Sequence, residues 1–246
     1  MHKVYVTELH RSLGYLATWL PTFELQLGDV LSDSNDGLRR VGHVRDHGLS
    51  FTPHGGRSRA GYEYTSSGAV SISAKLAGQV MADSALGETE AGLVIKFSRT
   101  NATVFVASGC ASMGIADLIP LGRAIEKRYA AGNWDHSWMV VTELVKANAV
   151  TIIIAGSQSA QADLKASGEV GQVGIKLSDI NVRLEAKRTI DIGFKIIAST
   201  GLTPLYRASG MKRSWLGAPR FRGGSAEHKP GGSVAFTELS PDDFPT

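Results

Sequence analysis

The side chains of this chain that could carry out chemistry lie apart from one another. His43 and His47 are four residues apart and His54 follows, a spacing that would suit metal ligands on one face of a helix. Gly48 and Pro53 interrupt any regular helix there, and no cysteine or pair of carboxylates completes a set of ligands. We therefore expect neither a metal site nor a cofactor.

The other candidates for catalysis are a thiol and two carboxylates. Cys110 is the single cysteine, it lies in a stretch of small residues, and a lone cysteine of this kind is usually a small buried hydrophobe. Glu126 and Glu143 fall in a predicted helix and a predicted strand and form no recognisable acid–base pair. A phosphate loop of the GxxxxGK[ST] type is missing from the sequence. These patterns predict a protein that is not an enzyme.

The composition is that of a globular chain rather than a membrane-spanning helical one. The 246 residues are 43% hydrophobic and 20% charged, and no apolar run reaches the roughly 18 residues that a spanning helix needs. The first residues lack the apolar segment of a secretory signal, and a single cysteine cannot form an internal disulfide, so we expect a cytoplasmic protein. A net charge of +3 is too small to predict binding of nucleic acid.

The distribution of charge along the chain is more informative than its sum. Residues 205–222 contain five cations and no acid, whereas residues 223–246 contain four acids and one lysine, a net charge of −3. Removing residues 223–246 would therefore leave +6 on residues 1–222, which favours an anionic membrane surface. A solvated basic patch beside an acidic tail explains the same pattern. The residues predicted to bind anionic lipid are Arg207, Lys212, Arg213, Arg220 and Arg222.

Hydrophobic periodicity predicts two helices and several strands. Apolar spacings of three and four indicate helices over residues 4–13 and 115–131. By composition, residues 52–61 are predicted to form a loop and residues 201–210 a turn. Shorter apolar runs predict strands over residues 138–146, 150–155 and 161–167.

Three longer segments alternate between apolar and polar residues, as half-buried strands do. Residues 69–80 and 93–106 are predicted to pair as a long hairpin, and residues 173–197 continue the alternation through one change of phase. We therefore predict an α+β fold with a twisted, mainly antiparallel sheet, long amphipathic strands, one N-terminal helix and one interior helix. The apolar faces of these strands contain Val70, Ile72, Leu76, Leu93, Ile95, Val173, Ile175, Val182, Leu184, Ile192 and Phe194.

The last 24 residues are predicted to be separate from the rest. Residues 223–232 are rich in glycine, serine and proline, which is typical of a flexible linker. Val234, Phe236 and Leu239 follow it and could dock on the body of the protein. We therefore divide the chain into a domain of residues 1–222 and a linker with a short tail, residues 223–246.

Several short stretches resemble the bacterial gasdermin family. Leu9-His10-Arg11-Ser12-Leu13-Gly14-Tyr15, then Trp19-Leu20-Pro21 and Leu38-Arg39-Arg40-Val41-Gly42, resemble the start of that family's sequences. Val140-Val141-Thr142-Glu143 is similar to the strand after its central helix, and residues 171–197 stand where the family has its second membrane-inserting hairpin. The order of elements is similar over most of residues 9–212.

The resemblance implies an α+β pore-forming domain that a short C-terminal segment keeps monomeric and inactive. It implies that a protease removes the segment and that two long hairpins then become membrane strands of a β-barrel pore formed by a ring of copies, in cell death or antiphage defence. The implied partners are an anionic lipid membrane, further copies of the chain and an activating protease. The implied location is cytoplasmic when inactive and the inner membrane when active. One departure is that bacterial members often carry a cysteine near the N-terminus for lipid attachment, whereas here the cysteine is Cys110.

A second function remains open from the same residues. Most alternating strands cover their own protein's core rather than a membrane. The chain would then be a non-catalytic, β-rich binding or interaction module.

Overall fold

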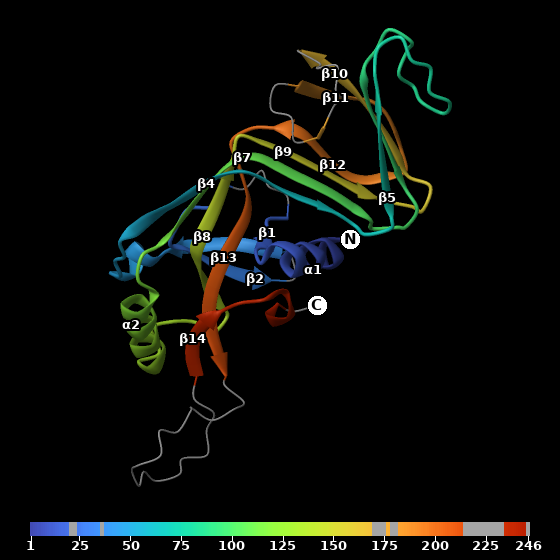
Figure 1. The fold of residues 1–246 in the computed structure, drawn as a ribbon. Coiled ribbons are helices and arrows are strands. Elements are labelled where there is room, and N and C mark those ends of the chain that lie inside the picture. The colour runs from blue at the N-terminus through green and yellow to red at the C-terminus, as the bar shows by residue number, and fades with distance from the viewer. Residues whose placement is uncertain (20–23, 35–36, 169–175, 178–181, 214–233, 245–246) are drawn as a thin grey trace, which may run out of the picture. The chain divides into compact units, whose positions relative to one another are not determined.

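A computed structural model describes residues 1–19, 24–34, 37–168, 176–177, 182–213 and 234–244 of the chain. The fold is α+β, as predicted, with mostly antiparallel strands and two α-helices in the described residues. The course of the chain through these helices and strands is drawn in Figure 1. The chain divides into two compact units. Unit 1 comprises Met1–Glu24, Gly56–Ser112 and Val145–Leu205, and unit 2 comprises Leu25–Gly55, Met113–Leu144 and Tyr206–Thr246.

Both predicted helices are confirmed, and local sequence explains their ends. Helix α1 ends before Gly14, whose φ of 74° is a left-handed conformation that glycine adopts without strain. Helix α2 begins later than predicted because Asp117 caps it by accepting a hydrogen bond from the Ile119 amide at 3.0 Å. The helices are α1 (His2–Leu13) and α2 (Leu118–Ala130), with two short 3-10 helices, η1 (Val44–His47) and η2 (Pro241–Asp243). Neither α-helix has the length and apolarity that crossing a membrane as a helix requires.

The described strands belong to two sheets. In the large sheet the order is β1-β13-β8-β7-β9-β12, with β14 beside β13, β2 beside β8, β3 beside β2 and β4 beside β7. The small sheet, in unit 1, has the order β11-β10-β6-β5. The strands are β1 (Leu16–Ala17), β2 (Asp29–Ser34), β3 (Gly37–His43), β4 (Pro53–Thr65), β5 (Val70–Lys75), β6 (Gly92–Phe97), β7 (Thr103–Ile115), β8 (Trp138–Ala147), β9 (Ala149–Ala155), β10 (Gln161–Gly168), β11 (Val182–Ile190), β12 (Ile192–Ser199), β13 (Leu202–Arg213) and β14 (Val234–Glu238).

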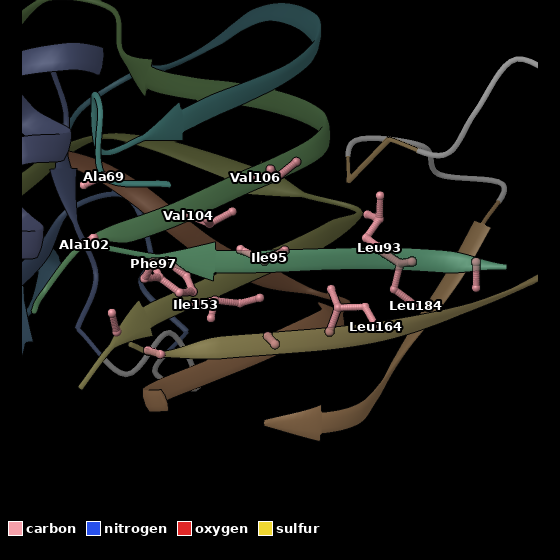
Figure 2. Packing of buried hydrophobic residues seen from close by; sticks show 14 residues of the cluster. Ala69, Leu93, Ile95, Phe97, Ala102, Val104, Val106, Ile153, Leu164 and Leu184 are labelled. Carbon is pink, nitrogen blue, oxygen red and sulfur yellow. The ribbon is translucent and has the colours of Figure 1, made fainter. Parts of the chain in front are cut away.

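The core of unit 1 lies between the small sheet and strands β7 and β9 of the large sheet. Leu93 and Ile95 on β6, with Leu164 on β10, belong to the same buried cluster as Val104 on β7 and Ile153 on β9 (Figure 2). Side chains on one face of paired strands point the same way. The small sheet therefore turns one apolar face inward.

The predicted hairpin exists, but it is shorter and its burial differs from the prediction. Strands β5 and β6 are antiparallel, with Ile72 opposite Ile95. However, β5 ends at Lys75 rather than Val80, and Ile72 is 41% exposed whereas Lys75 is fully buried. The prediction that residues 69–80 bury their apolar face was therefore wrong, because β5 is an edge strand and Lys75 is held by carbonyl groups instead.

Two further assignments were wrong because glycines were taken as signs of turns. Of the predicted loop over residues 52–61, residues 53–61 lie in strand β4, where a Cβ on Gly61 would lie 2.5 Å from the carbonyl oxygen of Ala107. Glycine there permits close approach to the neighbouring backbone. Residues 201–210 lie almost wholly in strand β13, and only Gly201, with a φ of 72°, has a left-handed turn conformation.

The predicted strand over residues 93–106 is in fact two strands in different sheets. Strand β6 ends at Phe97, and β7 begins at Thr103 after a turn in which Asn101 has a φ of 62°. Asparagine tolerates this conformation better than most residues. The predicted strands over residues 138–146, 150–155 and 161–167 are confirmed as β8, β9 and β10.

We expect Gly61→Ala to lower the free energy of unfolding by about 1–3 kcal/mol, because the added methyl group overlaps the backbone of strand β7. Gly55→Ala in the same strand is the matched control, since no atom lies within 4 Å of its Cβ position. Chemical denaturation measures both. Equal stabilities of the two variants would contradict the close approach.

Candidate functional site

The C-terminal segment lies in unit 2 as an added strand. Strand β14 pairs antiparallel with β13, with Phe236 opposite Met211 and Glu238 opposite Ser209. Backbone hydrogen bonds of this kind tolerate many side chains, because they involve only the main chain. Strand pairing therefore attaches the segment, and its position along β13 must be fixed by side chains.

Phe236 connects the segment to helix α2. Its ring lies 3.2 Å from the position that a Cβ on Gly122 would occupy, so glycine allows the ring to approach the helix. Its backbone amide donates a hydrogen bond of 2.9 Å to Glu126 Oε1. Glu126 therefore holds the segment through this hydrogen bond.

Leu239 makes a second contact of the same type. Its backbone amide donates to the carbonyl oxygen of Ala208 at 2.9 Å, and its side chain lies 3.1 Å from the Cβ position of Gly210. Val234 lies opposite Arg213 and is half-buried, as are Phe236 and Leu239. All three apolar residues predicted to dock are therefore partly covered.

Ion pairs complete the attachment. Arg207 lies 3.3 Å from Glu238 and 3.4 Å from Glu143, and Lys212 lies 2.5 Å from Asp243. Partial burial alone would raise the pKa of Asp243, but hydrogen bonds from Lys212 and Ser240 lower it below the ordinary value. Arg207 and Lys212, which were predicted to bind lipid, are thus paired with acids. Two of these acids, Glu238 and Asp243, lie in the tail.

The remaining predicted lipid-binding residues cannot be placed in the same way. Arg213 ends strand β13, and its side chain is not described. Arg220 and Arg222 lie outside the described residues.

A groove adjoins the docked segment. It has a volume of about 480 Å³, and its lining includes Ile115, Leu118, Ile119, Phe236 and Glu238. Ile119 is 64% exposed, so the groove has an open apolar rim. The carboxylates beside it, on Glu126 and Glu143, already hold the Phe236 amide and Arg207.

The predicted membrane-facing residues occupy several environments in unit 1. Leu93, Ile95 and Leu184 are buried in the core, and Val70 and Ile192 are half-buried against it. Leu76 is half-buried beyond the end of β5, and Phe194 is half-buried and stacks on Trp19 with ring centres 5.2 Å apart. Ile72 is exposed. Val173 and Ile175 lie outside the described residues, and Val182 begins β11 with its side chain not described.

Two of the three histidines considered for a metal site have structural contacts, and the third, His54, is exposed. His43 Nδ1 accepts a hydrogen bond from the Arg45 amide, and His47 lies 5.2 Å, centre to centre, from each of Trp134 and Trp138. Cys110 is buried, which raises the pKa of its thiol. Among the described residues, no three or more His, Cys, Asp or Glu side chains are grouped as metal ligands would be.

Comparisons with models of protein families and with curated proteins gave no match to this chain.

We expect Phe236→Ala to weaken docking of the C-terminal segment by about 1 kcal/mol, because a half-buried aromatic contact with α2 is lost. Faster cleavage of residues 234–244 by a non-specific protease would measure this, with the rest of the chain as an internal reference. Thr237→Ala is the matched control because Thr237 is exposed in the same strand. Equal cleavage rates for the two variants would contradict the role of Phe236.

Acid should also loosen the segment. The pKa of Asp243 is lower in the folded chain than its ordinary value of about 3.9, so the ionised carboxylate stabilises docking at neutral pH. That stabilisation is lost as the pH falls below about 4 and Asp243 takes up a proton. Hydrogen exchange measured between pH 7 and pH 3 should show that the protection of the Ser240 amide, relative to its intrinsic exchange rate at each pH, falls in acid. Asp243→Asn should remove part of this pH dependence, and an unchanged profile would argue against the pair.

Proposed function

We propose that this chain is a membrane pore-forming effector that its own C-terminal segment holds inactive. In this proposal, proteolysis between residues 213 and 234 frees the segment, copies assemble on an anionic membrane, and strands insert to form a β-barrel pore. The observation that carries it is the docked strand β14, which is attached to unit 2 through strand pairing, two glycine contacts and ion pairs.

The ion pairs support an electrostatic consequence of removing the segment. Glu238 and Asp243 pair with Arg207 and Lys212, so removal of the tail would take away an acidic partner from each, although Arg207 would keep Glu143. Loss of residues 223–246 changes the net charge from +3 to +6, since those residues carry −3. Each cation near an anionic leaflet contributes about 1 kcal/mol to membrane attraction.

The amphipathic small sheet supports the membrane step. A strand in a membrane barrel needs one apolar face for lipid and satisfies its backbone groups by pairing with its neighbours. The small sheet has an apolar face containing Ile72, Ile95 and Leu164, and on its other face lie Ser73, Lys75 and Lys165. Strands β5 and β6 have six residues each, so adjoining residues would have to join them to reach the roughly 9–11 that cross a bilayer.

A second candidate function is a non-catalytic binding module. The burial of Leu93, Ile95 and Leu184 within the core of unit 1 favours it, because these apolar residues already have partners in the folded chain. The groove beside β14 would then be the binding surface.

A leakage experiment separates the two functions. A site-specific protease sequence is inserted after Arg222 of the full chain, and dye release from anionic liposomes at low salt is recorded before and after cleavage. Release only after cleavage is expected. Intact liposomes after complete cleavage would favour the binding module.

A matched pair of variants tests whether strand faces meet lipid. Ile72→Lys places a charge on the apolar face at a side chain that is already 41% exposed, so the uncleaved chain should still fold. At mid-membrane this charge costs about 2–4 kcal/mol and should abolish leakage. Ser73→Lys adds the same charge on the opposite face of β5, at a side chain that is exposed, and should leak like the parent. Equal leakage by the two variants would rule out insertion of this face.

A further inference from the structure

Residues 76–91, which connect β5 to β6, form a structure that we call the strap. The strap is anchored to the polar face of the small sheet in unit 1, the face on which Lys75, Asp163 and Lys165 lie. It contains no helix or strand of its own. Long segments of this kind are usually mobile unless specific contacts hold them.

Lys75 holds the strap at the end of strand β5. Its side chain is fully buried, and its ammonium group donates to the carbonyl oxygens of Glu90 at 2.7 Å, Gly87 at 2.8 Å and Glu88 at 3.4 Å. An ammonium group has three donors, and burying it without partners is costly. The three carbonyl groups therefore make burial of Lys75 possible, and Lys75 in turn fixes their positions.

Glu90 attaches the same part of the strap to two other strands. Its carboxylate accepts from Lys187 on β11 at 2.8 Å and lies 3.1 Å from Lys165 on β10. It also accepts from the Gly87 amide at 2.8 Å. Hydrogen bonds from Lys187, Gly87 and Lys165 lower the pKa of Glu90 to about 2, so it is ionised at neutral pH.

A second attachment lies at Asp163 on strand β10. This fully buried carboxylate accepts from the Ala85 amide at 2.6 Å and pairs with Arg188 on β11 at 2.9 Å. The carbonyl oxygen of Asp83 accepts hydrogen bonds from Gln161 and Arg188. The strap is thus bound at two places, through residues 83–85 and residues 87–90.

The strap also packs directly on the sheet. Leu86 is 5% exposed, and its Cδ1 lies 2.8 Å from the position of a Cβ on Gly92. Any larger residue at Gly92 would displace Leu86 and overlap the Leu164 carbonyl oxygen, which lies 2.1 Å from that position. The apolar contact lies between the two polar attachments in the sequence.

We propose that the strap is a latch that attaches and detaches as one unit and holds strands β5 and β6 to strands β10 and β11. The reason is that its contacts share residues. The carbonyl oxygens of Gly87 and Glu90 both accept hydrogen bonds from Lys75, and the Gly87 amide donates to the Glu90 carboxylate. With Lys96 paired to Asp83 at 3.9 Å, the strap contacts all four strands of the small sheet. Detachment would leave Lys75, Lys165 and Lys187 without their partners in the strap, whereas Arg188 and Asp163 would keep each other. The inference concerns unit 1 alone and goes beyond the proposed pore.

Amide hydrogen exchange on the full chain tests the latch with the variant Lys75→Met, which keeps the length of the side chain and removes its donors. Loss of hydrogen bonds to a charged group should raise exchange at the Gly87 amide by about tenfold or more. The decisive site is the Ala85 amide, whose own acceptor Asp163 is unchanged. If the strap is one unit, exchange at Ala85 should rise by a similar factor.

Lys195→Met is the matched control, because Lys195 lies on β12 and bonds Thr189 rather than the strap. It should leave both amides unchanged. If Lys75→Met does not fold, Glu90→Gln gives the same test, since it keeps the side-chain shape and removes the charge that Lys165 and Lys187 contact. Faster exchange at Gly87 with an unchanged rate at Ala85 would overturn the latch and show independent contacts. The readout involves no membrane, so it is separate from the outcome of the leakage experiment.

Discussion

The structure of unit 1 depends on the burial of one face of a four-stranded sheet. Leu93, Ile95 and Leu164 form that face, and they share a buried cluster with Val104 and Ile153 of strands β7 and β9. Removal of apolar surface from water is the main favourable contribution to folding. Once this face is turned inward, every other residue of the same strands is turned the other way. The polar face of the small sheet follows directly from the position of its apolar face.

Part of the polar face of the small sheet is also covered, so charged side chains on it are buried and need partners. Lys75 and Asp163 are fully buried, and buried charges are tolerated only when they are paired and hydrogen-bonded. The backbone of residues 83–90 supplies carbonyl groups for Lys75 and an amide for Asp163, which also pairs with Arg188 on β11. A connection that looks irregular in sequence therefore has a defined position.

The C-terminal segment in unit 2 is also held by backbone hydrogen bonds, apolar contacts and ion pairs, but these contacts are more exposed. Backbone pairing with β13 gives it an orientation, and Gly122 and Gly210 admit Phe236 and Leu239. Its ion pairs are partly exposed, and such pairs typically contribute less than about 1 kcal/mol each. The segment is therefore held by several modest interactions rather than by a large buried core.

The sequence alone determined the features that depend on neighbours along the chain. Apolar spacing located both helices, short apolar runs located β8 and β9, and the tail's Val234, Phe236 and Leu239 stood out as docking residues.

Tertiary structure decided whatever depends on distant partners. Alternation in residues 69–80 shows two faces, but burial of Lys75 and exposure of Ile72 follow from carbonyl groups 12 to 15 residues away and from the edge position of β5. Glu126 became a contact of the tail through a residue 110 positions later. Gly61 was a turn signal in sequence and a site of close strand approach in space. The physical reason is that local sequence limits backbone conformation, whereas burial and pairing are set by which surfaces meet.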